Sequence, residues 1–442
     1  MQVTASKRKI RTIQLVALIF FTVSGGPYGL EPLLAYAGAH AAILLLLITP
    51  IIWDIPSIAT VLELNSMMPV SGGYYQWVKR ALGLHWAFYE GWWTWLYTFV
   101  DLAIYPVLFV EYLAFFFPDI HVYKIPICMV IIWSATILNI TGINPVGKVS
   151  MLLGSLVIIP FIVLTVVAFQ HYHTSVSIPA LSLKGTSYSA IGMGLYTIMW
   201  NFIGWDNTTT YAEEVNKPIR SYLISVIIAF LLIFCLYFLT LLISLASGID
   251  ANTLKSNGYP ALGVLIGGRW LGAVIAVGGM ASALGLYSSV LLSVSRVPKV
   301  MADDKLMPAI LDRLHPRFKT PYISIISCSA IVSVMIFWTF EDLLIIDVTL
   351  YGAALMLEYV SLIALRRRFP HEHRPFKIPL GIPGLCILFL LPISVYVIAL
   401  SAAFINTGLS IKPVIFAIAS LLSAEIIWRI LVCRRKEDIF PL

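Results

Sequence analysis

Charged side chains are scarce in this chain: Asp, Glu, Lys and Arg make up 12% of its 442 residues, whereas hydrophobic residues make up 60%. Ordinary soluble domains carry about a quarter charged residues, so this composition excludes a soluble protein and indicates an integral membrane protein. The five cysteines lie within or at the ends of apolar segments and show no paired spacing, which excludes a disulfide framework. We find neither a low-complexity tract nor a soluble domain.

Signatures of catalysis are also missing. Residues 171–173 and 371–373 each contain two histidines, but they lie in connections without a third ligand nearby, so we expect no metal site. The glycine pair at 267–268 lacks the phosphate-binding lysine and the strand of a nucleotide loop. No nucleophile and base are arranged for hydrolysis. We therefore expect no enzymatic activity and no cofactor.

Long apolar runs dominate instead. About twelve of them are long enough to span a bilayer, which places both termini on one side. Most Lys and Arg residues fall on that same side, and the positive-inside rule makes it cytoplasmic. The net charge of +7 therefore needs no nucleic-acid partner, and we expect a multi-pass protein of the plasma or inner membrane. The segments are centred near residues 25, 52, 100, 132, 157, 200, 232, 283, 330, 354, 391 and 422.

The first apolar segment, residues 13–37, contains a short stretch that is hostile to helix. Glycine adds backbone freedom and proline removes a donor, so we expect the helix to break within the hydrocarbon layer. Freed backbone groups are tolerated there only where they line a cavity or meet a ligand, which makes the break a candidate binding site. A packing kink is the alternative. The stretch consists of Ser24, Gly25, Gly26, Pro27, Tyr28 and Gly29.

The sixth segment repeats this anomaly. A polar interruption containing Asn201, Gly204, Trp205 and Asp206 lies at membrane depth. Two broken helices, each opening a set of five, indicate inverted repeats with a binding site at the bilayer midplane. We expect residues 1–170 to form the first repeat (spans 1–5), 171–378 the second (spans 6–10), and 379–442 spans 11 and 12 with a cytoplasmic tail.

Acidic residues within the apolar segments are the remaining signal. Glu31 and Asp206 lie at the breaks, and Asp101 shares a helix face with Tyr105 in span three. Intramembrane acids are usually functional, although each could instead cap a broken helix. No basic residue lies near the centre of a span, so these acids, with Asp347, are protonated, hydrogen-bonded or paired with a bound cation. We expect the acids nearer span ends to be solvated or structural: Asp54, Glu63, Glu90, Glu111 and Glu425.

Together these residues make the chain resemble the amino acid/polyamine/organocation (APC) superfamily, and within it the polyamine uptake transporters. The matching motifs are residues 24–29 with Glu31, residues 101–113, and residues 205–218; residues 69–74 are similar to the superfamily's first cytoplasmic loop. The resemblance implies an all-α fold of twelve transmembrane helices, with five-plus-five inverted repeats (LeuT-like) and discontinuous helices 1 and 6. It also implies secondary transport.

Two positions depart from the family pattern. Many polyamine transporters have a second acid after the one that matches Glu31, but Pro32 stands here. Some proton-coupled members carry a lysine within span five, whereas here only Lys148 at its start is available, so a carboxylate would have to carry any proton.

We therefore expect proton-coupled uptake of polyamines or cationic amino acids, with the bilayer, a small-molecule substrate and protons as the partners. The substrate-binding candidates come from both breaks and from span three, and Glu31, Asp101, Asp206 and Asp347 are the proton-coupling candidates. A neutral amino acid permease or exchanger is the alternative, because the positive end of a half-helix suits a carboxylate. A transporter-like nutrient receptor is a third reading, and no charge ring or filter sequence supports a channel.

Overall fold

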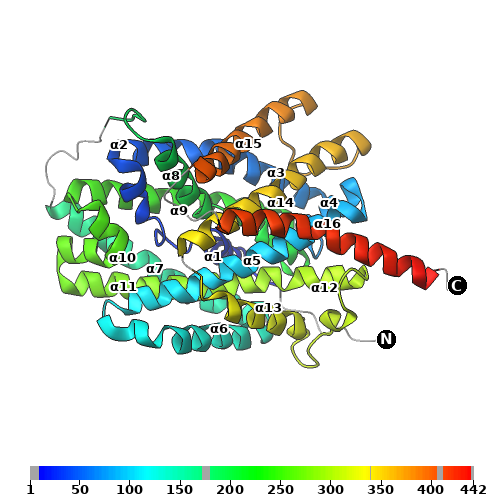
Figure 1. The fold of residues 1–442 in the computed structure, drawn as a ribbon, viewed down its shortest axis with the longest axis horizontal. Helices are drawn as coiled ribbons and strands as arrows, with labels where there is room; N and C mark the ends of the chain where they lie inside the picture. Colours follow the sequence, from blue (N-terminus) through cyan, green and yellow to red (C-terminus); the bar gives the residue numbers. More distant parts are fainter. Residues whose placement is uncertain (1–8, 172–179, 339, 406–411, 440–442) are drawn as a thin grey trace.

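The computed structural model describes residues 9–171, 180–338, 340–405 and 412–439. This part of the chain is built of helices and turns, with two isolated β-bridges and no strand. Most helices run roughly along the longest axis of the molecule (Figure 1). The first half contains α1 (Thr12–Val23), α2 (Pro32–Thr49), the π-helical η1 (Pro50–Asp54), α3 (Ile55–Met67), α4 (Gly73–Leu82), α5 (Leu84–Leu113), η2 (Pro118–Tyr123), α6 (Lys124–Ile140) and α7 (Ile143–His171).

The second half begins with α8, which the Ser187 hydroxyl caps by accepting the Ala190 N–H at 3.1 Å. Pro218 at the first position of α9 and Gly248 just after its end mark the boundaries of that helix. The elements are α8 (Tyr188–Trp200), η3 (Asn207–Thr210), η4 (Ala212–Glu214), α9 (Pro218–Ser247), α10 (Ala251–Gly267), α11 (Arg269–Val294), α12 (Arg296–Asp303), η5 (Ala309–Asp312), α13 (Tyr322–Met335), α14 (Phe340–Arg368), α15 (Ile382–Ile405) and α16 (Lys412–Ile439).

Nine helical stretches within the described residues are long and apolar enough to cross a membrane. They match nine of the predicted segments, and the prediction of an all-helical membrane protein is confirmed. The other three predicted segments contain shorter helices: α1 with 12 residues, α8 with 13 and α13 with 14. Two of these, α1 and α8, stop where helix breaks were expected.

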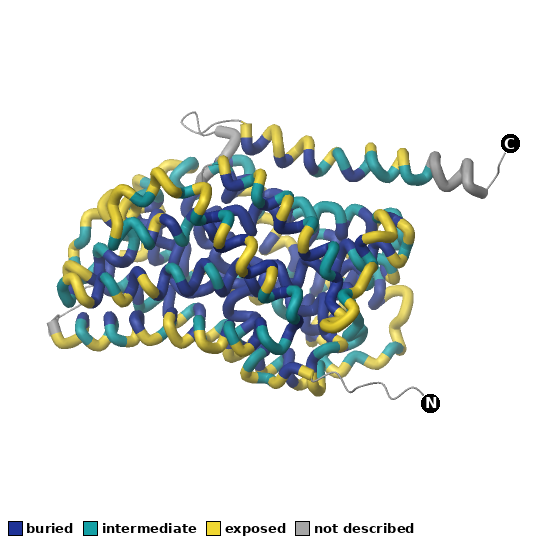
Figure 2. Tube along the Cα trace, turned by 90° about the horizontal axis from the view of Figure 1, so that it is seen from below, coloured by how far each residue is buried: buried dark blue, intermediate teal, exposed yellow. Residues whose placement is uncertain are grey.

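The helices form a buried centre with a more exposed periphery (Figure 2). Buried residues predominate in α5, α11 and α14; α5 packs against both other helices, α11 also contacts α1, and α14 also contacts α8. By contrast, α16 runs along the outside of the body and exposes large apolar side chains such as Leu422 and Ile426. In a bilayer such apolar surface faces lipid, as the composition requires.

One end of the molecule is closed by main-chain contacts. Ile10 N–H donates to the Glu214 carbonyl oxygen at 3.0 Å, and Asn216 N–H donates to the Ile10 carbonyl oxygen at 3.0 Å. Gly72 N–H donates to the carbonyl oxygen of Thr210 at 2.9 Å. We call this the α4/α12 end, because both short helices lie there (Figure 1).

Side-chain contacts complete this closure. Arg296 of α12 donates to Oε1 of Glu214 at 2.9 Å, and Lys79 of α4 lies 2.6 Å from Oδ1 of Asp304. The residues before α1, between α2 and α5 and after η3 thus meet at one end. The sequence had predicted all of them to lie on a single side of the membrane.

The segment 70–77 differs from what its sequence predicts. Its Tyr- and Trp-rich face is typical of a helix that lies along the membrane interface, but Tyr74, Tyr75 and Trp77 of α4 are completely buried. A Cβ atom on Gly73 would lie 2.2 Å from the Thr209 hydroxyl oxygen, so α4 packs tightly against η3. The aromatic face of α4 therefore belongs to the protein core.

Candidate functional site

The first break separates α1 from α2, and glycine is required to make it. Gly25, Gly26 and Gly29 have positive φ angles of 64°, 102° and 91°, a region that other residues rarely adopt. Space is short as well, because a Cβ atom on Gly29 would lie 2.3 Å from Cζ3 of Trp200. Glycine is therefore required at position 29, because no other residue suits both the left-handed backbone and the small space beside the Trp200 ring.

Most backbone donors of the first break are satisfied within the chain. The N–H groups of Ser24 and Gly25 both donate to one carbonyl oxygen in α1, at 2.9 Å each. Gly26 N–H donates to the Ser24 hydroxyl at 3.0 Å, and Gly29 N–H donates to Oε2 of Glu31 at 2.5 Å. The break thus offers a ligand few free N–H groups.

The second break follows α8. Residues 201–206 connect α8 to the short turn η3 without regular helix. Gly204 has a φ of 95°, and a Cβ atom there would lie 2.3 Å from the Thr22 carbonyl oxygen of α1. The second break therefore packs directly on the end of α1, which only glycine permits.

Tyr237 of α9 links the two breaks. Its hydroxyl oxygen lies 2.6 Å from the Ser24 hydroxyl oxygen and 3.0 Å from the Asn201 carbonyl oxygen. The tyrosine ring also contacts Phe202 edge to face, with centroids 5.1 Å apart. Tyr237 therefore couples the two breaks, because a movement of one break would shift the tyrosine and with it the hydrogen bond to the other break.

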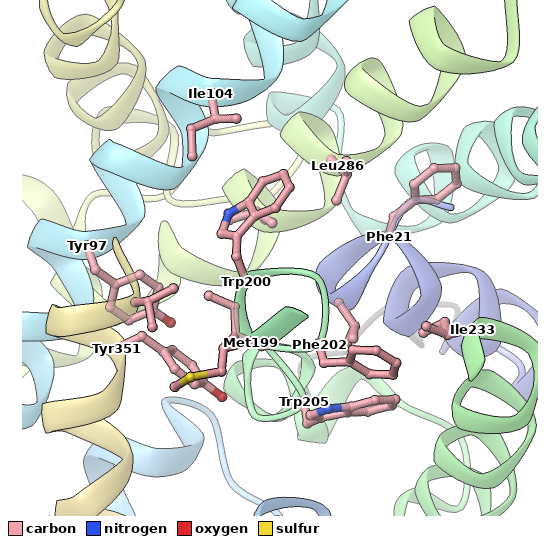
Figure 3. Packing of buried hydrophobic residues seen from close by; sticks show 14 of the residues in the cluster. Phe21, Tyr97, Ile104, Met199, Trp200, Phe202, Trp205, Ile233, Leu286 and Tyr351 are labelled. Carbon is pink, nitrogen blue, oxygen red and sulfur yellow. The ribbon is translucent and has the colours of Figure 1, made fainter. Parts of the chain in front are cut away.

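A small inner cavity lies where the breaks meet α5, α11 and α14. The volume that the centre of a water molecule can occupy in this cavity is about 10 Å³, which corresponds to about one water molecule. Figure 3 shows Tyr97 and Tyr351 close together beside Trp200, and their ring centroids are 5.4 Å apart. The lining residues are Thr22, Val23, Ser24, Tyr97, Asp101, Tyr105, Trp200, Asn201, Ile203, Gly204, Asn207, Leu286 and Tyr351.

Asp101 is the carboxylate of the inner cavity. The Tyr105 hydroxyl donates to its Oδ2 at 2.5 Å, and the Trp200 indole N–H donates to its Oδ1 at 3.3 Å. Both donors are neutral, so they position the carboxylate without compensating a negative charge. Asp101 can therefore receive a cationic group in the cavity.

Glu31 faces a second, larger space that we call the outer cavity, of about 880 Å³. The Tyr112 hydroxyl donates to Oε1 of Glu31 at 2.8 Å, and both residues line this cavity. Gly29 also lines the outer cavity, while Trp200, against which Gly29 packs, lines the inner one. The contact between Gly29 and Trp200 thus separates the two spaces.

Asp206 and Asp347 lie behind the inner cavity. The Tyr351 hydroxyl donates to Oδ1 of Asp206 at 3.1 Å and accepts the Gly204 N–H at 3.2 Å. Asp347 is fully buried, and neither of its carboxylate oxygens has a hydrogen-bond partner in the described structure. It interacts electrostatically with Asp101.

Buried acids without a basic partner are the main electrostatic feature of the molecule. At the α4/α12 end Glu63 is paired, with Oε2 lying 2.5 Å from Arg366. In the part of the chain that the structure describes, no ion pair involves the buried carboxylates of Glu31, Asp54, Glu90, Asp101, Asp206, Asp347 and Glu358. Asp54 and Glu90, expected to be solvated or structural, are thus not solvated.

The predicted site residues fall into three groups. Those that line the inner cavity are Ser24, Asp101, Tyr105, Asn201 and Gly204, and those that line the outer cavity are Gly29 and Glu31. Neither cavity is lined by Gly25, Gly26, Tyr28, Trp205, Asp206 or Asp347. Tyr28 donates to the Ile275 carbonyl oxygen at 2.7 Å, and the Trp205 N–H donates to Oδ1 of Asp54 at 3.2 Å. Both rings thus face other helices.

Sequence reasoning missed several aromatic residues of the site, including Trp200, Tyr97 and Tyr237. Tyr97 lies one helical turn before Asp101, which itself lies one turn before Tyr105, so the i, i+4 spacing could have identified it. Tyr237 carries no such signal, because its contact with both breaks depends on how α9 packs. The polar lining is therefore richer in tyrosine than the motifs suggest.

Long apolar helices and two interlocked breaks enclosing a small polar cavity define a multi-pass membrane protein that binds a small solute, which is the architecture of a transporter. A family model described as amino acid permease matches residues 10–423, and the chain belongs to this family. The resemblance to the APC superfamily is confirmed.

Individual relatives agree with this assignment. The chain is similar to the polyamine transporter RMV1 of Arabidopsis thaliana, with 31% identity over 87% of this chain and 79% of that protein. It is also similar to the polyamine transporter PUT1 of Oryza sativa subsp. japonica, with 31% identity over 88% of this chain and 72% of that protein. The serine/threonine exchanger SteT of Bacillus subtilis is 23% identical over 85% of this chain and 87% of that protein. These relatives are transporters by name, not enzymes.

Proposed function

We propose that the protein is a secondary active transporter that takes up polyamines across the plasma or inner membrane, coupled to protons. The observation that carries this proposal is the set of buried carboxylates without basic partners around the two breaks. A substrate with several ammonium groups would supply the missing positive charges. The names of the similar plant transporters support the same substrate class.

Asp101 is the residue that we assign to an ammonium group in the inner cavity. Its partners Tyr105 and Trp200 fix both carboxylate oxygens. Tyr97 and Tyr351 add aromatic faces, which attract cations within about 6 Å. Asp347, one layer behind, strengthens the negative potential at Asp101. A cation is therefore favoured here over a neutral group.

Glu31 is the residue that we assign to the entry of substrate. It lies in the wall of the outer cavity, directly across the Gly29 and Trp200 contact from the inner one. A polyamine carries charges at several points along a flexible chain. One ammonium group would be held at Glu31 before another reaches Asp101.

The engaged amides of the first break argue against a substrate carboxylate. Amino acid substrates need free N–H groups or a cationic side chain for their carboxylate. Here the amides of Ser24, Gly25, Gly26 and Gly29 already donate within the chain. This arrangement fits a substrate that has only ammonium groups.

The fold that we propose for this function has twelve spans, ten of them in two inverted repeats of five, followed by two further spans. Nine long apolar helices, together with α1, α8 and α13, supply the required number. Residues 1–170 and 171–378 would form the repeats, and 379–442 the remainder. Both termini would be cytoplasmic, which makes the α4/α12 end the cytoplasmic end.

Uptake by purified protein in liposomes tests the proposal. Radiolabelled spermidine should accumulate when the outside is more acidic than the lumen, and a protonophore should remove the accumulation. Unlabelled putrescine and spermine should compete, whereas serine and threonine should not. Glu425→Gln, at a partly exposed acid of α16 that lies outside both cavities, serves as the control with unchanged uptake.

Neutral amino acid exchange is the second candidate, because the similarity to a serine/threonine exchanger covers 85% of the chain. In that case serine or threonine would displace bound ligand, and spermidine would neither bind nor be transported. Accumulation that follows sodium and ignores pH would refute proton coupling while leaving the substrate assignment intact.

A further inference from the structure

Three buried carboxylates meet behind the inner cavity, and two of them lie outside the predicted site. Glu90 belongs to α5, Asp206 to the second break and Glu358 to α14. Each is at most 3% exposed. Tyr97, about two turns after Glu90 on α5, contacts Tyr351, about two turns before Glu358 on α14, with ring centroids 5.4 Å apart, and the Tyr351 hydroxyl donates to Asp206. The packing of α5 against α14 thus brings the three carboxylates near one another, where Glu90 interacts electrostatically with Asp206, and Glu358 with both. We call these residues the inner carboxylate cluster.

The cluster contains several polar atoms without partners. The Thr94 hydroxyl lies 3.5 Å from Oε1 of Glu90, but Oε2 of Glu90 and Oε2 of Glu358 have no hydrogen-bond partner among the described residues. The hydroxyl of Tyr74, a completely buried residue of α4, also lacks one there. Its electrostatic neighbours are the three cluster carboxylates, so this donor lies near the cluster.

No cationic side chain among the described residues balances the cluster. The other titratable groups near the cluster are Tyr97 of α5 and Tyr351 and Tyr359 of α14. Asp54 of η1 interacts with Tyr359, and through it with the cluster. All are acidic or neutral. In the described structure no lysine, arginine or histidine forms an ion pair with Glu90, Asp206 or Glu358.

Three negative charges held this closely in a medium of low dielectric are unstable, so the cluster has to bind positive charge. A metal ion fits poorly, because no group of three acidic, histidine or cysteine residues in the described chain has the geometry to hold one. The cluster also lines neither cavity, so a polyamine does not reach it. A proton bound to one of these carboxyl groups needs neither a coordination shell nor a cavity.

We propose that Glu90 and Glu358, together with Asp206, form the site that carries the co-transported proton. This inference rests on the proposed function and extends it, because it separates the proton site from the ammonium site at Asp101. The proton converts one cluster carboxylate to a carboxylic acid on the outer side of the cycle. It leaves as H⁺ on the cytoplasmic side, which restores the carboxylate.

Tyr351 and Tyr74 connect the cluster to its surroundings. The Tyr351 hydroxyl touches Asp206 while its side chain lines the inner cavity, so occupation of the cavity alters the contact with the cluster. Tyr74 follows Gly73, which packs against Thr209 at the α4/α12 end. Separation of α4 from η3 would therefore open the cluster to cytoplasmic water and release the proton.

Two isosteric variants, Glu90→Gln and Glu358→Gln, test the assignment. Each amide imitates a permanently protonated carboxyl group. In liposomes with the membrane potential clamped at zero, we expect spermidine-for-spermidine exchange to stay within about twofold of the unchanged protein. A gradient of about one pH unit supports up to about tenfold accumulation per proton, and both variants should lose it. Spermidine uptake by either variant should also no longer acidify the liposome lumen, and a pH-sensitive dye in the lumen would report this.

Glu425→Gln is the control, because Glu425 lies on α16 at the periphery, lines neither cavity and does not belong to the cluster. It should keep both exchange and driven accumulation. Driven accumulation and lumen acidification that persist in both cluster variants would overturn the inference. Loss of exchange together with accumulation would also overturn it, because that result places Glu90 and Glu358 in substrate binding or in the fold. Failure of proton coupling in the unchanged protein would refute the proposed function instead.

Discussion

Replacement of Asp101 by asparagine separates charge from shape in the inner cavity. The amide has nearly the same volume, so the packing of Tyr105 and Trp200 around it should persist. What disappears is the negative charge that we assign to an ammonium group of the substrate. Removal of one partner from a desolvated charge pair costs about 2 to 5 kcal/mol.

Even the lower limit of that range predicts a clear effect. About 2 kcal/mol corresponds to about 30-fold in Kd, since about 1.4 kcal/mol is tenfold. One hydrogen bond also changes, because an asparagine NH₂ cannot accept from either the Tyr105 hydroxyl or the Trp200 N–H. A lost hydrogen bond of this kind contributes about 1 kcal/mol to stability. The melting temperature should therefore fall slightly, while spermidine binding weakens strongly.

Equilibrium binding of radiolabelled spermidine to purified protein is the appropriate assay. Tyr105→Phe is the matched control, because it removes the 2.5 Å hydrogen bond but leaves the carboxylate in place. We expect Tyr105→Phe to bind spermidine within about fivefold of the unchanged protein, in line with a loss of about 1 kcal/mol. Spermidine binding by Asp101→Asn within about threefold of the unchanged protein would refute the assignment of Asp101 to the substrate.

Three further predictions concern other parts of the molecule. Glu31→Gln should weaken spermidine binding at least about tenfold in the same assay, and unchanged binding would remove Glu31 from the substrate path. A single cysteine at Ser256, in a background without native cysteines, should react with an impermeant reagent from outside, and one at Asp312 only after permeabilisation; the reverse would invert the topology. Glu63→Gln leaves Arg366 buried without its partner and should destabilise the fold by about 3 to 5 kcal/mol, which thermal unfolding would detect as a lowered melting temperature.

The helix breaks could be predicted because their causes are local. Gly25, Gly26 and Gly29 need no distant partner to disfavour a helix, and the structure gives all three positive φ angles. The same holds for the long apolar helices, whose length and composition follow directly from the sequence. The inner cavity was predicted in part, since Asp101 and Tyr105 signalled it by spacing.

The inner carboxylate cluster could not be predicted in this way. Glu90 lies near the start of α5, where a carboxylate is normally solvated by water or lipid head groups. It is buried because α4 folds back over it, and α4 itself looked like an interfacial helix. Both features depend on contacts between segments distant in the chain, such as that between Gly73 and Thr209, which periodicity does not report.

The main-chain hydrogen bonds at the α4/α12 end have a consequence for how this end opens. Ile10, Gly72, Thr210 and Asn216 take part through backbone atoms, so replacement of the side chains of Ile10, Thr210 and Asn216 leaves these bonds available. Gly72 is the exception, because its φ of 90° strains any other residue. An alanine scan would therefore overlook most of this gate. If the end opens during transport, the bonds break together and form again in each turnover, as in the unzipping of a short strand pair. The rate of that event then depends on the backbone rather than on side chains, and related proteins can vary in sequence at the other three positions while keeping the same gate.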